Sequence, residues 1–304
     1  MVAFASPVTT PTRRWYPVGA VAERAQCVVI ANRTEGVVMP TGSAASYAVV
    51  TGASSGIGLE LARQFAEHGF DVLICAEDEA LPAAAAELRS SGTSITVIRA
   101  DLTTYQGVEQ LIAAIARANR PVDAVVLNAG FGNGGRFVDI ALADELRLLQ
   151  LNVVSTVHLA KRLLPAMVGR GAGRLLFTAS VASTMPGPFY ATYAASKSFV
   201  LSFAEALRYE VKDSGVTVTA LMPGPTDTNF FDRADMEATP AGEGKKDDPA
   251  EVAADGFAAL MAGKDHVVAG ALKNKVQVAA AALLPDSATA AIHARLTEPP
   301  AVTA

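Results

Sequence analysis

From residue 45 onward, short runs of β-branched and other apolar residues alternate with longer segments whose apolar residues recur at helical spacing. Runs such as "VVL" and "LLF" are apolar at every position, which is typical of strands buried on both faces. The predicted strands are 47–50, 71–76, 95–100, 124–129, 174–180, 216–222 and a weaker 266–270. The predicted helices are 57–68, 79–90, 105–118, 142–168, 192–213 and 249–262. Strand followed by helix, repeated, predicts an α/β fold with a doubly wound parallel sheet of six to seven strands and helices on both faces.

The remaining segments differ from this pattern and suggest how the chain is organised. Residues 1–44 are rich in Pro and Gly, so we expect a poorly ordered N-terminal extension. An alternative start at Met39 or an Arg-bearing targeting peptide would also fit. Residues 45–270 are expected to form one domain, with a mobile lid at about 225–248, where the chain is long, polar and glycine-bearing. Residues 271–304 are expected to form a C-terminal helical tail.

Composition and charge narrow the classes of partner. The net charge is −5 and the 25 Lys and Arg residues are scattered, which argues against nucleic acid and anionic membrane as partners. No apolar run reaches the ~18 residues expected of a transmembrane helix. The only cysteines, Cys27 and Cys75, lie far apart, which favours a reducing compartment and a cytoplasmic protein. The four histidines lack metal-ligand spacing, so we expect no metal site.

A glycine-rich turn follows the first predicted strand. In "VVTGASSGIG", Gly52, Gly56 and Gly58 are spaced as GxxxGxG. Glycines permit a tight turn and a close approach of the backbone to a pyrophosphate, whose charge is stabilised at the N-terminus of the next helix. An ordinary strand-to-helix turn is the alternative for the motif alone. Because the P-loop lysine is missing, nucleoside triphosphate chemistry is disfavoured.

A second group of chemically active residues lies in "YATYAASK". On a helix, Tyr190, Tyr193 and Lys197 would share one face, because they are spaced i, i+3 and i+7. Ser180 lies 13 residues before Tyr193, at the end of the fifth predicted strand. Taken singly, Tyr193 and Lys197 would more simply be a surface pair, Ser180 a strand-end cap, and Asn152 a residue on a solvated helix face. The prolines of "PGPF" disfavour helix at Tyr190, so we expect it to precede the helix, in a loop that lines the cleft.

These motifs together resemble the short-chain dehydrogenase/reductase family, which has a Rossmann fold. The family's TGxxxGxG turn matches Thr51 and the three glycines, and its motifs recur in order over residues 45 to about 262, including "LNAG", "YAASK" and "PGPTDT". The stretch "NAGFGNGGRF" is most similar to the DltE-like bacterial branch. The resemblance implies that the cofactor-binding residues are Thr51, Gly52, Ser54, Ser55, Gly56, Ile57, Gly58, Glu77, Asp101, Leu102, Asn128, Ala129, Gly130, Tyr193, Lys197, Pro223, Gly224 and Thr228.

The implied activity is hydride transfer between a nicotinamide dinucleotide and a secondary alcohol or carbonyl compound. A phenol has a reference pKa of ~10, and a nearby lysine cation and an oxidised nicotinamide would lower it. The implied catalytic residues are Asn152, Ser180, Tyr193 and Lys197. Tyr193 would be the acid/base, Ser180 would stabilise charge on the substrate oxygen, and Asn152 would anchor a water that links Lys197 to solvent.

The sequence leaves the choice of dinucleotide open and favours NAD over NADP. Glu77 follows the second strand, where an acid would bond the ribose 2′-hydroxyl and repel a 2′-phosphate. Many NAD-using relatives carry the acid one residue earlier, at the position of Ala76, so Glu77 could instead face water. The family resemblance also implies a small-molecule substrate and a homodimer or homotetramer. A dinucleotide-sensing regulatory protein without chemistry is the alternative function.

Overall fold

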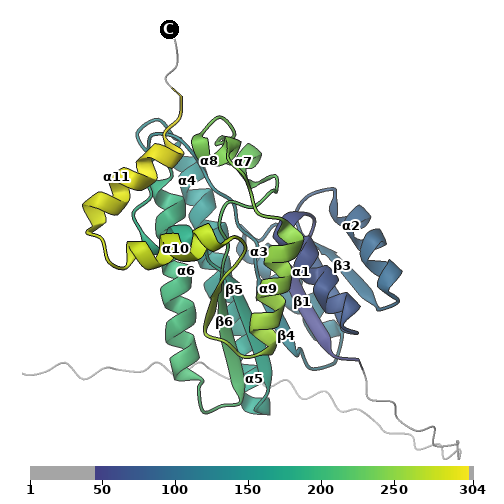
Figure 1. Ribbon diagram of the computed structural model, residues 1–304. Coiled ribbons are helices and arrows are strands. Elements are labelled where there is room, and N and C mark those ends of the chain that lie inside the picture. Colours follow the sequence, from purple (N-terminus) through teal and green to yellow (C-terminus); the bar gives the residue numbers. More distant parts are fainter. Residues whose placement is uncertain (1–44, 301–304) are drawn as a thin grey trace, which may run out of the picture. The chain divides into compact units, whose positions relative to one another are not determined.

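The computed structural model describes residues 45–300, which contain a seven-stranded parallel sheet in the order β3-β2-β1-β4-β5-β6-β7 (Figure 1). The predicted N-terminal extension, residues 1–44, lies outside the described residues. The strand order reverses between β1 and β4, so the predicted doubly wound Rossmann fold is confirmed. The strands are β1 (Tyr47–Thr51), β2 (Asp71–Ala76), β3 (Ile95–Arg99), β4 (Ala124–Leu127), β5 (Gly173–Thr178), β6 (Val216–Met222) and β7 (His266–Val268).

Helices connect the strands and cover both faces of the sheet (Figure 1). Helices α3, α5 and α6 pack on one face, and α1, α2 and α9 pack on the other. The helices are α1 (Gly56–Glu67), α2 (Leu81–Leu88), α3 (Tyr105–Arg117), α4 (Leu142–Leu149), α5 (Thr156–Arg170), α6 (Ala191–Glu210), α7 (Phe230–Arg233), α8 (Pro240–Glu243), α9 (Pro249–Met261), α10 (Leu272–Ala281) and α11 (Asp286–Thr297).

Alternate residues of each strand enter two separate hydrophobic cores. In β1, Val49 belongs to the core under α3, α5 and α6, whereas Val50 belongs to the core under α1, α2 and α9. The parallel register carries this alternation across the sheet, because Val49 pairs with Leu73 and Val125, and both enter the same core as Val49. Strands with two buried faces are therefore apolar at every position, as the sequence predicts.

The prediction of one continuous helix over 142–168 is wrong in detail. Helix α4 ends at Leu149, six residues follow in a π-helical segment (Gln150–Ser155), and α5 then continues to Arg170. Two hydroxyl side chains near this segment bond back to main-chain carbonyls, Ser155 to Leu151 and Thr156 to Asn152. Such bonds compete with regular helical pairing, and π segments of this kind commonly mark functional sites.

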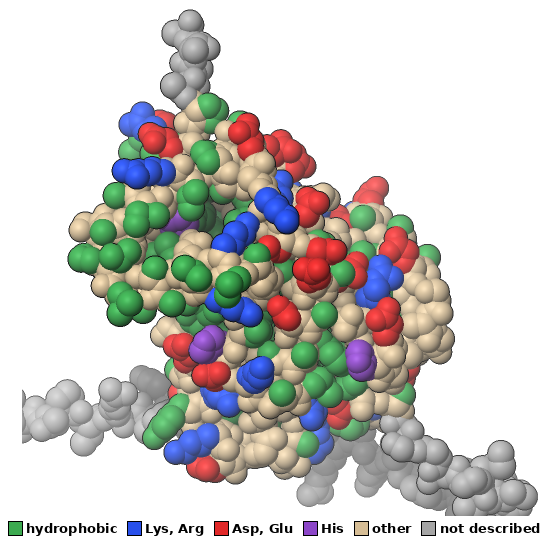
Figure 2. Space-filling model, in the orientation of Figure 1, with side chains coloured by type: hydrophobic (Ala, Val, Ile, Leu, Met, Phe, Trp, Pro, Cys, Tyr) green, Lys and Arg blue, Asp and Glu red, His purple; other side chains and the backbone are tan. Residues whose placement is uncertain are grey.

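The predicted lid region and the C-terminal tail also contain regular structure. Two four-residue helices, α7 and α8, lie within 225–248, where the sequence predicts loop; whether this segment moves stays a prediction. The described part of the tail contains α10 and α11, and apolar side chains gather over them on the surface (Figure 2). Among residues 45–300, no helix combines the length and the apolar character needed to span a bilayer.

Phe65 links α1 to α9 and offers a test of the core. Its ring is fully buried and packs edge-on against Phe70 and Phe257, with centroid separations of 5.1 and 5.0 Å. We expect Phe65→Ala to lower the free energy of unfolding by about 3–5 kcal/mol, because it removes these contacts and leaves a cavity. Denaturant unfolding would measure this. The control Phe137→Ala, at a side chain that is 62% exposed, should change it by less than about 0.5 kcal/mol.

Candidate active site

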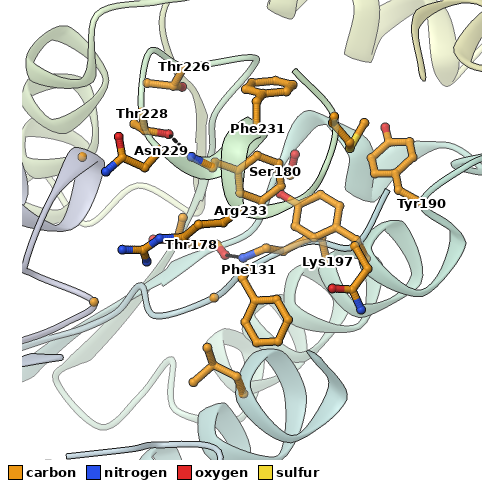
Figure 3. Close-up of a pocket in the computed structure, with 18 of the residues that line it drawn as sticks. Phe131, Thr178, Ser180, Tyr190, Lys197, Thr226, Thr228, Asn229, Phe231 and Arg233 are labelled. Carbon is orange, nitrogen blue, oxygen red and sulfur yellow. Dashed lines mark hydrogen bonds between the residues drawn. The ribbon is translucent and has the colours of Figure 1, made fainter. Parts of the chain in front are cut away.

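A cavity of about 950 Å³ lies at the carboxyl ends of the strands. Its walls come from the glycine loop after β1, the loops after β2 to β6, the start of α6, the 225–248 segment and the C-terminal helices. Figure 3 shows Lys197 and Ser180 within it, with Thr228 and Asn229 on one side of the view and Tyr190 on the other. Parallel doubly wound sheets bind ligands at this edge, where the strand order reverses.

The glycine loop has the backbone shape that its sequence predicts. Gly52 and Gly56 have left-handed φ angles of 66° and 55°, which side chains larger than glycine rarely adopt. Gly58 is needed for a different reason, since a Cβ there would overlap the carbonyl oxygen of Gly52. Ser54, Ser55 and Ile57 also line the cavity. The loop thus leads directly into the N-terminus of α1, an arrangement that fits a pyrophosphate.

Thr51 and Asn128 hold the loops after β1 and β4 together. The buried Thr51 hydroxyl donates to the carbonyl oxygen of Val126 and accepts from the backbone N–H groups of Asn128 and Ala129. The Asn128 amide donates to the carbonyl oxygens of Thr51 and Gly52, and its oxygen accepts from Thr178. Both were predicted as cofactor-binding residues. Their observed hydrogen bonds are to the protein, so they shape the cavity floor.

Three acidic residues, Glu77 to Glu79, follow β2, and the first two, which line the cavity, are each paired with an arginine that also lines it. Glu77 binds Arg147 through both carboxylate oxygens, at 3.1 and 3.3 Å. Asp78 accepts a hydrogen bond from Ser54 at 2.7 Å and lies 3.5 Å from Arg233 of α7. Glu77 therefore does not simply face water. The loop after β2 brings carboxylates and guanidinium groups together at one end of the cavity.

Tyr193 and Lys197 lie one turn apart on α6, and both are buried. The Lys197 ammonium donates to the carbonyl oxygen of Thr178 at 2.7 Å and lies 5.8 Å from the centre of the Tyr193 ring. Burial raises the pKa of Tyr193 to about 12, an increase that the Ser180 hydroxyl partly offsets, and burial lowers the pKa of Lys197 to about 8. Burial therefore dominates the pKa of Tyr193 in this structure, and the lowering comes from Ser180 rather than from Lys197 as expected.

Ser180 and Asn152 each make structural hydrogen bonds. The Ser180 oxygen accepts from the backbone N–H of Ala182, so its hydroxyl can still donate inside the cavity, either to Tyr193 or to a substrate oxygen. Asn152, which is 1% exposed, lies in the π-helical segment. Its amide accepts from the Phe131 N–H and donates to the Phe131 carbonyl and to Ser196. The reading of Asn152 as a solvated helix face is therefore wrong, and its side chain positions the loop after β4.

The other predicted cofactor residues also border the cavity. Asp101 accepts hydrogen bonds from the backbone and hydroxyl of Thr103, which fixes its carboxylate after β3. A Cβ at Gly56 would lie 2.8 Å from the methyl group of Thr228, so the segment after β6 closes against the glycine loop. The remaining predicted residues in the cavity lining are Leu102, Ala129, Gly130, Pro223 and Gly224.

Tyr190 is the N-cap residue of α6, so the prediction that it precedes the helix and lines the cleft is confirmed. Its ring stacks on that of Tyr193, with 5.6 Å between centroids and an interplanar angle of 21°. Several further residues line the cavity without being predicted from the sequence, namely Phe131, Met236, Gln277, His293, Leu296 and Thr297. No motif marks them, and His293 lies 103 residues from its partner Tyr190, so only the fold brings them together.

The site geometry agrees with the family to which the chain is related. The family model described as "short chain dehydrogenase" matches residues 46–238, so the chain belongs to this family. It is therefore an oxidoreductase that transfers hydride between a nicotinamide dinucleotide and an alcohol or carbonyl group. A Streptomyces coelicolor protein named "Putative ketoacyl reductase" is 38% identical over 186 residues, which are 60% of this chain and 70% of the relative.

Solved structures give the same relationship. A short-chain dehydrogenase from Sphingobium yanoikuyae in complex with NADPH has a TM-score of 0.69 and 29% identity, covering 73% of this chain and 87% of that one. A Burkholderia phymatum short-chain dehydrogenase/reductase in complex with NAD has a TM-score of 0.71 and 26% identity, covering 79% and 92%. The similarity to the DltE-like branch is not tested by these relatives and stays a prediction.

The crowding at Gly58 offers a test of the glycine loop. We expect Gly58→Ala to weaken NADH and NADPH binding by about tenfold or more, because the new methyl group displaces the Gly52 carbonyl and the loop that it belongs to. Fluorescence titration with each dinucleotide would measure this. Gly169→Ala is the control, since a Cβ there meets no atom within 4 Å. Unchanged dinucleotide affinity in Gly58→Ala would contradict this role of the loop.

Proposed function

We propose that the protein interconverts a secondary alcohol and a ketone, with Tyr193 as the acid/base. The supporting observation is that Tyr193, Lys197 and the hydroxyl of Ser180 meet in one cavity, at the other end of which lies a glycine loop suited to a dinucleotide. The dinucleotide, when bound, supplies or accepts the hydride. The named relatives support a carbonyl substrate, because one of them carries the name of a ketoacyl reductase.

In the direction of ketone reduction, the Tyr193 hydroxyl donates its proton to the carbonyl oxygen as hydride reaches the carbon. The Ser180 hydroxyl donates a hydrogen bond to the same oxygen and stabilises the charge that develops there. With a pKa of about 8, Lys197 is mainly cationic at neutral pH, and its charge favours the phenolate that Tyr193 leaves behind. Alcohol oxidation uses the same groups in reverse.

The roles of the surrounding residues follow from their contacts. Asn152 positions Phe131 and its loop, and we propose that it acts on the reaction through this loop and through the water path to Lys197 that the family resemblance implies. The 225–248 segment is proposed to close over substrate and cofactor, since Thr228 and Arg233 contact the glycine loop and Asp78. The alternative, a dinucleotide sensor without chemistry, is not favoured because such a protein needs no buried Tyr193 and Lys197.

We further propose a preference for NAD over NADP. Two carboxylates, Glu77 and Asp78, follow β2, and a ribose 2′-phosphate near them would meet their negative charge. Arg147 and Arg233 reduce this repulsion, because each is paired with one of the acids. One solved relative is in complex with NADPH and another with NAD, so our proposal rests on the loop after β2 of this chain.

A homodimer or homotetramer in the cytoplasm completes the proposal. Its support is the family resemblance, together with partly exposed apolar side chains on the α5 and α6 side of the molecule, among them Val154 and Phe199. Within the described residues, Cys75 is a free, buried thiol, and burial raises its pKa to about 12. An unreactive thiol of this kind is compatible with a reducing compartment.

Tyr193→Phe tests the catalytic assignment. We expect turnover to fall by about a thousandfold, because the substrate oxygen loses its proton donor, while NADH affinity stays nearly unchanged. Initial rates on a panel of ketones and alcohols, with fluorescence titration of the dinucleotide, would measure both. Tyr209→Phe, on the exposed part of the same helix, should behave as wild type. Turnover in Tyr193→Phe close to that of wild type would exclude Tyr193 as the acid/base.

Glu77→Gln tests the dinucleotide preference. The wild type should bind NADH more tightly than NADPH. In the variant the ratio of the two dissociation constants should shift by about tenfold toward NADPH, because Arg147 loses its partner and one negative charge is removed. Glu79→Gln is the matched control at an exposed acid two residues further on. The preference for NAD is contradicted if wild-type protein binds NADPH more tightly, and the role of Glu77 if both variants shift equally.

A further inference from the structure

A buried pair, Tyr190 and His293, borders the cavity beside Tyr193. Tyr190 precedes α6, whereas His293 belongs to α11 of the C-terminal tail, and their side chains are hydrogen-bonded through the phenolic oxygen and Nε2. A further bond from the Thr297 hydroxyl to the Pro188 carbonyl oxygen, at 2.9 Å, fixes α11 against the same segment. The tail therefore supplies a polar side chain to the substrate end of the cavity.

The direction of the hydrogen bonds in this pair is determined by a backbone carbonyl. Nδ1 of His293 lies 3.0 Å from the carbonyl oxygen of Pro186, which can only accept, so Nδ1 carries the hydrogen. Burial lowers the pKa of His293, which keeps the imidazole neutral at physiological pH and leaves Nε2 as an acceptor. The Tyr190 hydroxyl must then donate to Nε2.

This arrangement leaves the Tyr190 oxygen with lone pairs and no hydrogen to give. The imidazole is its only hydrogen-bond partner among residues 45–300. The ring stacks on Tyr193, the proposed proton donor, with 5.6 Å between centroids, so a group that reaches Tyr190 would lie a few bonds from the reacting carbon. Figure 3 places Tyr190 on the side of the cavity opposite Thr228, away from the proposed cofactor end.

We propose that Tyr190 and His293 form an acceptor subsite that selects ketones and alcohols carrying a second hydrogen-bond donor, a hydroxyl or amine, a few bonds from the reacting carbon. Tyr190 makes the contact. His293 is a positioning residue, because its Nε2 accepts the Tyr190 hydroxyl hydrogen and leaves the oxygen able only to accept. The subsite rests on the proposed function for its link to turnover, but its binding preference can be measured without turnover. A buried acceptor discriminates strongly because an analogue without the donor leaves it unpaired.

Matched aryl ketones provide the test: the meta and para isomers of hydroxyacetophenone, the methoxyacetophenones of the same ring positions, and acetophenone. The methoxy group keeps an oxygen acceptor and removes the donor. Wild-type kcat/KM should favour at least one hydroxy isomer over its methoxy counterpart by about tenfold. In Tyr190→Phe, this ratio should fall to near one, because the oxygen that accepts from the substrate hydroxyl is removed. Tyr209→Phe should keep the wild-type ratio.

His293→Leu separates positioning from simple packing. Once Nε2 is gone, the Tyr190 hydrogen is free to bond the ether oxygen, so kcat/KM for the methoxy ketone should rise severalfold while that for the hydroxy ketone changes little. A residue with only a structural role would lower the rates on all three kinds of ketone together. A uniform loss in His293→Leu would therefore overturn the positioning role.

The remaining outcomes distinguish the subsite from the function on which it rests. A wild-type ratio near one for both isomers, or a ratio that persists in Tyr190→Phe, overturns the subsite, since the preference would then be absent or caused by the size of the methyl group. If no probe is reduced with NADH or NADPH, the proposed function fails as stated. The subsite is then judged by calorimetric dissociation constants of the same ketones for wild type saturated with NAD⁺ or NADP⁺, in which no reduction occurs, with the same tenfold ratio expected.

Discussion

The hydroxyl of Thr51 joins the two halves of the sheet at the edge where the chemistry takes place. It donates to the strand β4 and accepts from two N–H groups of the loop that follows. From that loop, the Asn128 side chain donates to the carbonyl oxygens of Thr51 and Gly52 and accepts from the Thr178 hydroxyl at the end of β5. Both side chains satisfy buried backbone groups that would otherwise be costly, and they fix three adjacent loops at one point. The glycine turn, the loop at Phe131 and the Ser180 cap all keep their places relative to this cluster.

Most of the fold could be predicted from the sequence because the sheet is buried on both faces. A run such as Val49 and Val50 must be apolar throughout, and seven such runs separated by helical segments leave few topologies. The boundaries were harder. The π-helical segment carries no periodicity signal, and its residue Asn152 is hydrogen-bonded to Phe131, which is 21 residues away. Short helices such as α7 bury one or two side chains and leave no pattern to detect.

The candidate site likewise contains residues that the sequence predicts and residues that only the fold brings together. The sequence motifs predict several site residues, because their spacing reflects a single turn or strand end. These residues are Gly52, Ser180, Tyr193 and Lys197. The pKa of Tyr193 could not be predicted, because it depends on how completely the surrounding loops exclude water. The hydrogen bond between Tyr190 and His293 could not be predicted either, because the two residues are 103 positions apart and meet only in the folded chain. Local motifs predict the reaction, and long-range packing determines what else touches the substrate.

The C-terminal tail helps to line the cavity although its sequence contains no recognisable motif. The family match ends at residue 238, and α10 and α11 follow it. Because α11 lines the cavity through His293, Leu296 and Thr297, substitutions there can alter which compounds fit while the glycine loop and Tyr193 stay the same. Substrate specificity can therefore differ between related enzymes that catalyse the same hydride transfer. A comparison of relatives over residues 46–238 alone would leave out the α11 side chains that line the cavity.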